Sequence, residues 1–523
     1  MSANYYSQTP NFVSASSEDV DPRTRLFSFQ YTLGQLIGNN TMGPELNFTL
    51  SYSPTSATDY YDFGIGVAPA LTIYDATNGQ LLLASGESYR VDGSANPPIV
   101  QQNKMRTFDF ASMVTSEGRY GYRVTENDGT VTDLMEYDAG IYVTTRIYTA
   151  LGYSLIVDWE TFDLWGWGIS SISDDSGVTL LTIDHDAGPM LTFYPGSSEE
   201  YSITLGKANG YLSTISHSGL PEKAWHYYYQ DVGMGEGLQT LTQTVAITGL
   251  TKTVIYNSGT TNGLMLFPDQ SGQGALPAVT ELSVDPGFNQ PVMVTTYTPD
   301  TPQGFPNYLG YDAPQGGQWD ASTDYVYSLA GQDYSYSTTL TQTDSDGQLI
   351  TTYTYNNYHL LTRLEVQQGN TSYTVDTWYY ADKYQSDHPD ATYDDLPAQY
   401  QYPLSQTLTW SDDSGTRSEV TQYIYDGFGN LTQQIDPDGT QTDYEFYSSN
   451  GEVDSDDGYT GCPRDPNDFA NLMKSKKVTP APSDYDDVPV RATYYHYSPF
   501  EALDDRPMVT AIVKDKELSL IHI

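Results

Sequence analysis

A two-residue alternation of apolar and polar positions dominates this 523-residue chain. Short segments such as ELNFTLSYS, YVTTRIYTALGYSLIVDW and VTLLTIDHD carry it, and Asp-Gly, Asn-Gly and Ser-Gly pairs stand between many of them. In a strand, alternation places every second side chain on one face, and these dipeptides favour tight turns. The pattern therefore predicts an all-β fold.

Helical periodicity is weak, and its best candidate is the segment PNDFANLMKSKK. Phe469, Leu472 and Met473 would share one face of a helix, Asn467 or Asp468 can cap its start, and the following lysines suit its C-terminal end. We expect one short helix here.

A unit made of a turn, a strand and an aromatic pair recurs along the chain. Glycine accepts the positive φ of such turns, and aspartate bonds its own backbone there. Residues i and i+2 of a strand share a face, so Tyr423 and Tyr425 are expected on the same side, packed against a neighbouring unit. In the Gly-Asn turn, Asn430 can itself take the left-handed conformation next to Gly429. One unit cannot bury its aromatic face alone, which favours a stack of units.

The segment YIYDGFGNLTQQIDPDGTQTDYEF closely resembles the YD-repeat of the Rhs family. YSYSTTLTQTDSDGQLITTYTYNNYHLLTRLE is similar but looser, with Asn356 where the family has Asp and Tyr358-His359 where it has Gly-Arg or Gly-Asn. MGPELNFTLSYSP and GYSLIVDWE look like parts of the Rhs core, and GCPRDPNDFANLMKSKKVTPAP is similar to an insert of insecticidal-toxin members. The resemblance covers most of residues 26–513. The repeat-motif positions are Tyr353, Tyr355, Asn356, Tyr423, Tyr425, Asp426, Gly429, Asn430, Pro437, Asp438, Gly439 and Tyr444.

This resemblance implies a long β-sheet strip of YD-repeat hairpins, wound into part of a hollow shell. In bacterial polymorphic toxins and toxin complexes such a shell encloses a C-terminal toxin, and the family also includes cell-surface adhesion proteins. We expect the following regions: a polar N-terminal leader at 1–25, an N-terminal Rhs-core β region at 26–215, a loop-rich β region at 216–330, the YD-repeat region at 331–460, a short helix plus a Tyr-rich strand at 461–513, and a non-native or truncated end at 514–523.

The composition of the chain disfavours two classes of partner, nucleic acid and a membrane that the chain would span. With 22 Lys and Arg against 67 Asp and Glu, the formal net charge is -45, which disfavours nucleic acid as a partner. No segment has the roughly 18 consecutive apolar residues of a membrane span, and the start of the chain has no apolar core of a signal peptide. Together with the family resemblance, this predicts a secreted protein exported by a signal-peptide-independent route.

The sequence offers little catalytic chemistry. The single cysteine, Cys462, allows no internal disulfide, and the seven histidines form no HExxH motif. We therefore expect no metal site, no cofactor and no enzymatic activity. The segment DWETFDLWGWG leaves three readings open: a packed core corner, a sugar contact through Trp159, Trp165 and Trp167, or a glycoside hydrolase site that uses its carboxylates.

The leading hypothesis is the shell portion of a secreted toxin, which encapsulates and delivers a C-terminal toxic domain. Its expected partners are that domain, which this chain does not contain, and a shell-closing or secretion-apparatus protein. The alternative is a carbohydrate-binding or adhesion module, with carbohydrate as the partner. A glycoside hydrolase ranks third.

Overall fold

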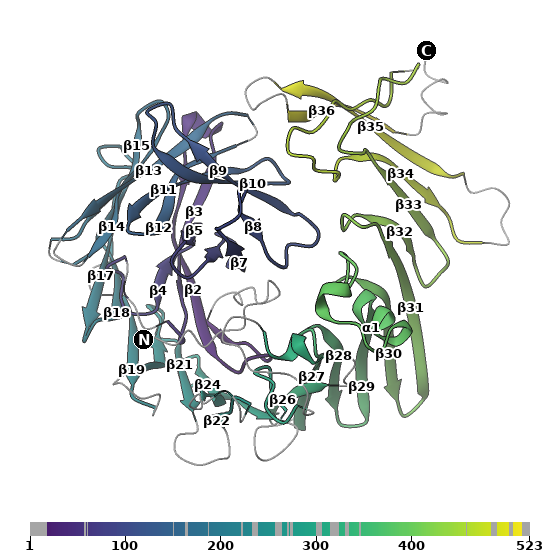
Figure 1. Ribbon diagram of the computed structural model, residues 1–523. Helices are drawn as coiled ribbons and strands as arrows, with labels where there is room; N and C mark the ends of the chain where they lie inside the picture. The colour runs from purple at the N-terminus through teal and green to yellow at the C-terminus, as the bar shows by residue number, and fades with distance from the viewer. Residues whose placement is uncertain are drawn as a thin grey trace.

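The computed structural model describes residues 18–514 apart from 57–58, 60, 150, 163–165, 187, 221–222, 233–238, 257–263, 269–270, 272–275, 300–305, 314–323, 330–333, 345–346, 457, 483–488 and 501–505. Almost all of its regular structure is antiparallel β-sheet, which confirms the predicted all-β class (Figure 1). The helical elements of the described residues are α1 (Tyr380–Asp387) and three short 3-10 turns, η1 (Asn39–Thr41), η2 (Val326–Ser328) and η3 (Tyr393–Asp395).

Most strands belong to one long sheet, here called the strip, in which each strand pairs with the next along the chain. Its first part contains β9 (Phe108–Val114), β10 (Tyr120–Glu126), β11 (Val131–Asp138), β12 (Ile141–Tyr148), β13 (Ser154–Thr161), β14 (Trp167–Asp174), β15 (Thr179–Asp184), β16 (Met190–Phe193), β17 (Tyr201–Ala208), β18 (Tyr211–His217), β19 (Ala224–Gln230), β20 (Thr240–Val245) and β21 (Thr251–Tyr256).

The second part of the strip contains β24 (Val279–Asp285), β25 (Met293–Pro299), β26 (Ser335–Asp344), β27 (Gly347–Asn356), β28 (Leu361–Gln368), β29 (Thr371–Tyr379), β30 (Pro403–Asp412), β31 (Gly415–Tyr425), β32 (Leu431–Ile435), β33 (Gln441–Phe446), β34 (Met473–Thr479), β35 (Arg491–Phe500) and β36 (Arg506–Lys514). Residue 215 lies within β18, which pairs with β19, and β25 pairs with β26 on either side of residue 330, so the expected boundaries at 215 and 330 mark no break in pairing. Figure 1 shows the strip following a curve, with α1, β7 (Ser88–Asp92) and β8 (Ile99–Val100) on its inner side. Within the described residues β36 has a register only with β35, so the strip does not close on itself.

Two smaller groups of strands lie beside the strip. β1 (Asp19–Val20), β2 (Phe27–Ile37), β3 (Glu45–Tyr52) and β4 (Val67–Pro69) form a separate sheet, whose apolar face packs on the strip in the largest core cluster. A branch of four strands leaves the strip at β12, which pairs with β5. This branch consists of β5 (Ile73–Asp75), β6 (Gln80–Leu82), β7 (Ser88–Asp92) and β8 (Ile99–Val100). A short hairpin joins β22 (Leu264–Met265) to β23 (Leu276–Pro277).

One kind of turn recurs between the strands. In the turn that starts at Asp426, the N–H of Gly429 donates to the carbonyl of Asp426, and the N–H of Asp426 donates to the carbonyl of Asn430. The fourth residue takes a positive φ, as expected for a type I turn with a following bulge. The turns that start at Asp174, Asn356 and Asp436 have the same two hydrogen bonds and a positive φ at the fourth residue.

The predicted helix at 466–477 is wrong. Asp465 accepts hydrogen bonds from the N–H groups of Asn467 and Phe469 with its side chain, and Asp468 has a φ of 60°. This is the repeat turn again, and β34 begins directly afterwards at Met473. The carboxylate competes for the amides that a helix would need, and this local competition outweighs a weak apolar periodicity. The one α-helix described, α1, lies elsewhere and was not predicted.

The expected N-terminal leader is shorter than residues 1–25. Asp19 and Val20 pair with Ser28 and Phe27, and the side chain of Arg25 is buried. Residues 18–25 therefore belong to the folded body, while residues 1–17 lie outside the described residues. Of the expected non-native end, Lys514 closes β36 and residues 515–523 also lie outside.

Candidate functional site

The tyrosines of the repeat lie on the inner side of the strip. Tyr423 and Tyr425 have ring centroids 6.4 Å apart on one face of β31, as predicted. Tyr425 stacks on Tyr402 at 4.5 Å, and its N–H donates to the hydroxyl of Tyr380 at the start of α1. The Tyr425 ring also lies 6.3 Å from the ring of Tyr380, and Figure 1 places α1 on the inner side of the curved strip, so this face of β31 is the inner one. Burial raises the pKa of Tyr425 to about 12, which keeps the hydroxyl neutral.

The looser repeat is built in the same way. Tyr355 is buried and stacks on Tyr336 at 5.2 Å, and Tyr353 lies on the same face two residues earlier. The side-chain oxygen of Asn356 accepts the N–H groups of Tyr358 and Leu360, both at 3.0 Å. Asparagine thus replaces aspartate in this turn without changing its hydrogen bonds.

The closely matching repeat has a more extensive network around its turn. Asp426 accepts the N–H groups of Phe428 and Asn430 at 2.9 Å, and Asn430 donates its amide both to Asp426 and to the carbonyl of Ala470. The left-handed conformation is taken by Gly429, whose φ is 83°, rather than by Asn430. Asn430 is instead the residue that ties this turn to the loop that precedes β34.

The second turn of this repeat is more open. Gly439 has a φ of 90°, follows Pro437, and donates its N–H to the carbonyl of Asp436. Asp438 accepts the N–H of Thr440 at 2.8 Å. Tyr444 lies in β33 with the ammonium of Lys476 over its ring at 5.6 Å. The motif residues thus form the turns and the inner face, and they do not converge on a single pocket.

A row of side chains on the inner face was not predicted. Tyr373, Trp410 and Arg417 are direct neighbours across β29, β30 and β31, on the same face as Tyr423. Tyr373 and Trp410 have ring centroids 5.8 Å apart, and the guanidinium of Arg417 lies 5.6 Å from the Trp410 ring. Trp410 is 37% exposed. The cross-strand register that assembles this row needs the structure, because the sequence does not say which strands are neighbours.

The opposite, outer face has its own apolar side chains. Trp378, Val420 and Ile424 are all exposed on β29 and β31, and the partner of Trp378 across the sheet is Ser405. Because Trp378 and Trp410 lie on opposite faces of adjacent strands, the two tryptophans form a matched pair for comparing the outside of the strip with its inside.

Trp159 and Trp167 of DWETFDLWGWG pack in the largest core cluster. Trp159 donates its indole N–H to the carbonyl of Thr144 at 2.7 Å, and Trp167 is buried. Their rings lie 5.4 Å apart and pack with Tyr61 and Tyr137. Trp165 lies outside the described residues. This packing favours the core-corner interpretation for the two described tryptophans, because Trp167 is buried and Trp159 is partly buried against the same cluster.

The Cys462 thiol and the His185 imidazole are two titratable groups whose pKa values are shifted by their surroundings. Burial raises the pKa of the Cys462 thiol to about 12, and its Sγ donates to the carbonyl of Pro463. His185 has an acceptor at each ring nitrogen, Asp62 at 3.1 Å and the carbonyl of Ile169 at 3.0 Å. Burial alone lowers the pKa of His185, but these hydrogen bonds outweigh burial and raise it.

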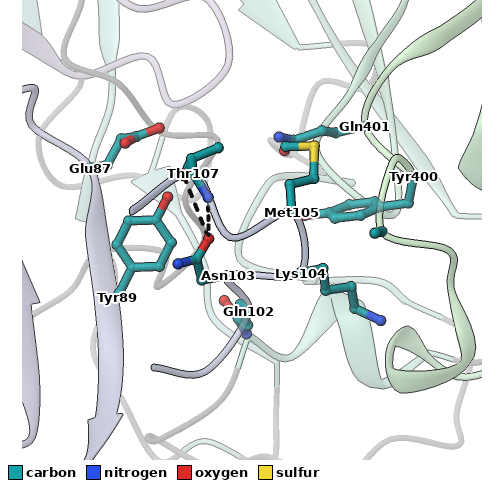
Figure 2. A pocket seen from close by; sticks show the side chains of 10 residues that line it. Glu87, Tyr89, Gln102, Asn103, Lys104, Met105, Thr107, Tyr400 and Gln401 are labelled. Carbon is teal, nitrogen blue, oxygen red and sulfur yellow. Dashed lines mark hydrogen bonds between the residues drawn. The ribbon is translucent and has the colours of Figure 1, made fainter. Parts of the chain in front are cut away.

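A small pocket lies inside the curve of the strip, between the loop that joins β8 to β9 and the segment that follows η3 (Figure 2). Glu87, Tyr89 and Thr107 line it on one side, and Tyr400 and Gln401 on the other. Burial raises the pKa of Glu87. Across the described residues no group of three or more His, Cys, Asp or Glu side chains is arranged to hold a metal ion. None of the described helices is long and apolar enough to span a membrane.

Comparison with known proteins identifies one segment. Residues 404–441 match the model of the RHS Repeat family, whereas a search of curated proteins finds no match. The solved structures with similarity include TcdB2-TccC3 (11% identity, 97% of this chain and 30% of that chain, TM-score 0.15), TcdB2-TccC3-Cdc42 (11%, 92% and 26%, TM-score 0.13) and the Photorhabdus luminescens Tc holotoxin pore (11%, 94% and 25%, TM-score 0.14). These TM-scores are too low to carry a structural argument, and the chain spans less than a third of each of these proteins. The matched segment runs from β30 to the start of β33, so the chain carries an RHS repeat, and the predicted resemblance to the Rhs/YD-repeat family is confirmed on these residues.

Proposed function

We propose that the chain forms part of an Rhs-type shell that encloses a passenger polypeptide and has no catalytic role of its own. The observation that supports this proposal is the position of the RHS repeat. Its strands form one wall of a curved strip, and its tyrosines lie on the inner face together with Trp410. A wall of this kind offers a passenger partly exposed aromatic surface and few positive charges.

The passenger that fits the proposal is a toxin domain joined C-terminally to the shell, delivered after secretion by a route that needs no signal peptide. A second protein that closes the strip belongs to the proposal, since within the described residues β36 pairs on one side only, with β35. The carbohydrate-binding or adhesion alternative ranks second, because two of its possible sugar contacts, Trp159 and Trp167, pack against the core.

Protease protection tests the proposal. A passenger of about 100 residues, a typical domain size, is fused after Lys514, and its lifetime under a nonspecific protease is compared with that of the same passenger fused before residue 1. Enclosure predicts longer survival for the C-terminal fusion only. Equal lifetimes for the two fusions would contradict the proposal.

A further inference from the structure

Two segments far apart in the chain meet inside the curve of the strip. The loop 101–107 leaves β8 and leads into β9, and the segment 393–402 begins at η3 and leads into β30. The ammonium of Lys104 donates to the carbonyls of Tyr393 at 2.7 Å, Asp394 at 3.1 Å and Leu396 at 3.0 Å. Three carbonyls match the three N–H donors of an ammonium group. The Tyr393 ring completes the site, with its centroid 4.6 Å from the same nitrogen.

The neighbour of Lys104 reaches the RHS repeat. A β-carbon added at Gly429 would lie 2.8 Å from Sδ of Met105 and 3.0 Å from Cε2 of Tyr402. Met105 and Tyr402 therefore both press against the turn that joins β31 to β32. A second bridge is nearby, since the amide of Asn471 donates to the carbonyl of Asn127 at 3.0 Å. The loop thus links the first strands of the strip with strands that follow about three hundred residues later.

The loop is braced for this contact. Asn103 accepts the N–H of Thr107 and donates its amide to the carbonyl of Phe108, so both ends of the loop are fixed to each other (Figure 2). Burial lowers the pKa of Lys104, and the charges of Asp394 and Asp395 oppose that effect. If the segments separated only slightly, the partly buried ammonium would lose its three carbonyl acceptors without regaining water, which costs free energy. The charge-assisted hydrogen bonds of Lys104 therefore favour the closed contact between the two segments.

We propose that loop 101–107 and segment 393–402 form a clasp that sets the curvature of the strip and opens independently of its strands. The strands are joined by continuous backbone ladders, such as the ten residue pairs of β26 and β27. Segment 393–402 packs on α1 through Tyr393, Leu396 and Tyr400. Its contact with loop 101–107 depends instead on a few side chains around Lys104, and a contact of this size opens at lower free energy than the strands. Opening would separate the part of the strip around β9 and β10 from the part around β30 and β31, and the hydrogen bonds between paired strands would stay intact. The proposal rests on the fold and does not require a passenger.

Hydrogen exchange on the unaltered chain gives the first test. The amides of Leu396, Tyr400 and Tyr402, which donate to carbonyls within their own segment, are expected to exchange before the ladder amides of β30 and β31, and together with the amides of Arg106 and Thr107. Exchange of segment 393–402 at the same rate as the ladders of β30 and β31 would overturn the proposal.

A variant gives the second test. Lys104→Met keeps most of the side-chain length and removes the ammonium, and Lys223→Met changes an exposed lysine as the control. Fluorescent labels at Ser116→Cys and Ser414→Cys, both in exposed turns, report the separation of these two parts of the strip, because the native Cys462 is buried. Lys104→Met is expected to lower and broaden the energy transfer and to speed exchange of the segment roughly ten- to hundred-fold, as for loss of hydrogen bonds to a charged group.

Three outcomes of the variant test would contradict the clasp proposal. Unchanged energy transfer in Lys104→Met would show that the clasp does not set the curvature. Equal changes in Lys223→Met would show a general effect of lost charge, which also overturns the proposal. If Lys104→Met unfolds the strands themselves, the ladders depend on the clasp and independent opening is wrong.

Discussion

Replacing Gly429 by alanine tests the geometry of the repeat and its contact with the clasp together. The φ of Gly429 is 83°, a conformation that costs an L-residue about 1–2 kcal/mol. The added β-carbon would also meet Met105 at 2.8 Å and Tyr402 at 3.0 Å. Met105 is flexible and can move aside, but Tyr402 is held by its stacking on Tyr425. Crowding of this kind costs about 1–3 kcal/mol more.

Gly439→Ala is the matched control in the same repeat. Its φ is 90°, so the backbone cost is the same, but the nearest atom to its added β-carbon is Cδ of Pro482 at 3.3 Å. We therefore expect Gly429→Ala to destabilise the chain by about 2–5 kcal/mol and Gly439→Ala by about 1–2 kcal/mol.

Equilibrium urea unfolding followed by circular dichroism measures both losses, and exchange of the Gly429 and Gly439 amides localises them. Met105→Ala in the Gly429→Ala background is expected to recover little of the loss, because the flexible Met105 can move aside and Tyr402 remains in contact. Equal losses for the two glycine variants, or full recovery from Met105→Ala, would refute the reasoning.

Three further predictions concern single side chains. Asp426→Ala removes the acceptor for two backbone amides and is expected to cost about 1–3 kcal/mol in urea unfolding, with a smaller loss for the exposed Asp438→Ala. The pKa of His185 is raised in the folded chain, so its stabilising contribution is complete below the unfolded pKa of about 6.5 and is lost as pH rises through the folded pKa. His185→Gln should flatten that fall in melting temperature as pH rises above about 6.5, and an unchanged pH profile would refute the assignment. Cys462 should react with a thiol reagent at pH 8 on the order of a thousand-fold more slowly in the folded chain than in urea, because its thiol is buried and its pKa is about 12; equal rates would place the thiol at the surface.

Local pattern was enough to predict the class of fold and the orientation of the repeat. Alternation fixed the strands, and the i, i+2 spacing placed Tyr423 and Tyr425 on one face. The turn residues also predicted where the turns lie. Which of Gly429 and Asn430 has the positive φ could not be predicted, because the side chain of Asn430 bonds to the carbonyl of Ala470, a residue 40 positions away in the sequence.

Contacts between distant segments were beyond the sequence. The helix at 466–477 failed because Asp465 forms a turn with its own backbone, a competition that apolar spacing does not register. Neither Lys104, an isolated lysine in a loop, nor Trp410 carried a recognisable pattern. Lys104 gains its role from carbonyls nearly three hundred residues away, and Trp410 gains its place from strand register.

The central claim is that the inner face of the strip holds a passenger, and site-specific photocrosslinking tests it most directly. A photoreactive phenylalanine analogue replaces Trp410 on the inner face in one variant and Trp378 on the outer face in the other, each in a chain fused C-terminally to a passenger. Both positions are partly exposed and lie on adjacent strands, so they differ chiefly in the face they occupy. Enclosure predicts crosslinks to the passenger from position 410 and few from position 378. Equal crosslinking from the two faces, or crosslinking from position 378 alone, would contradict the account.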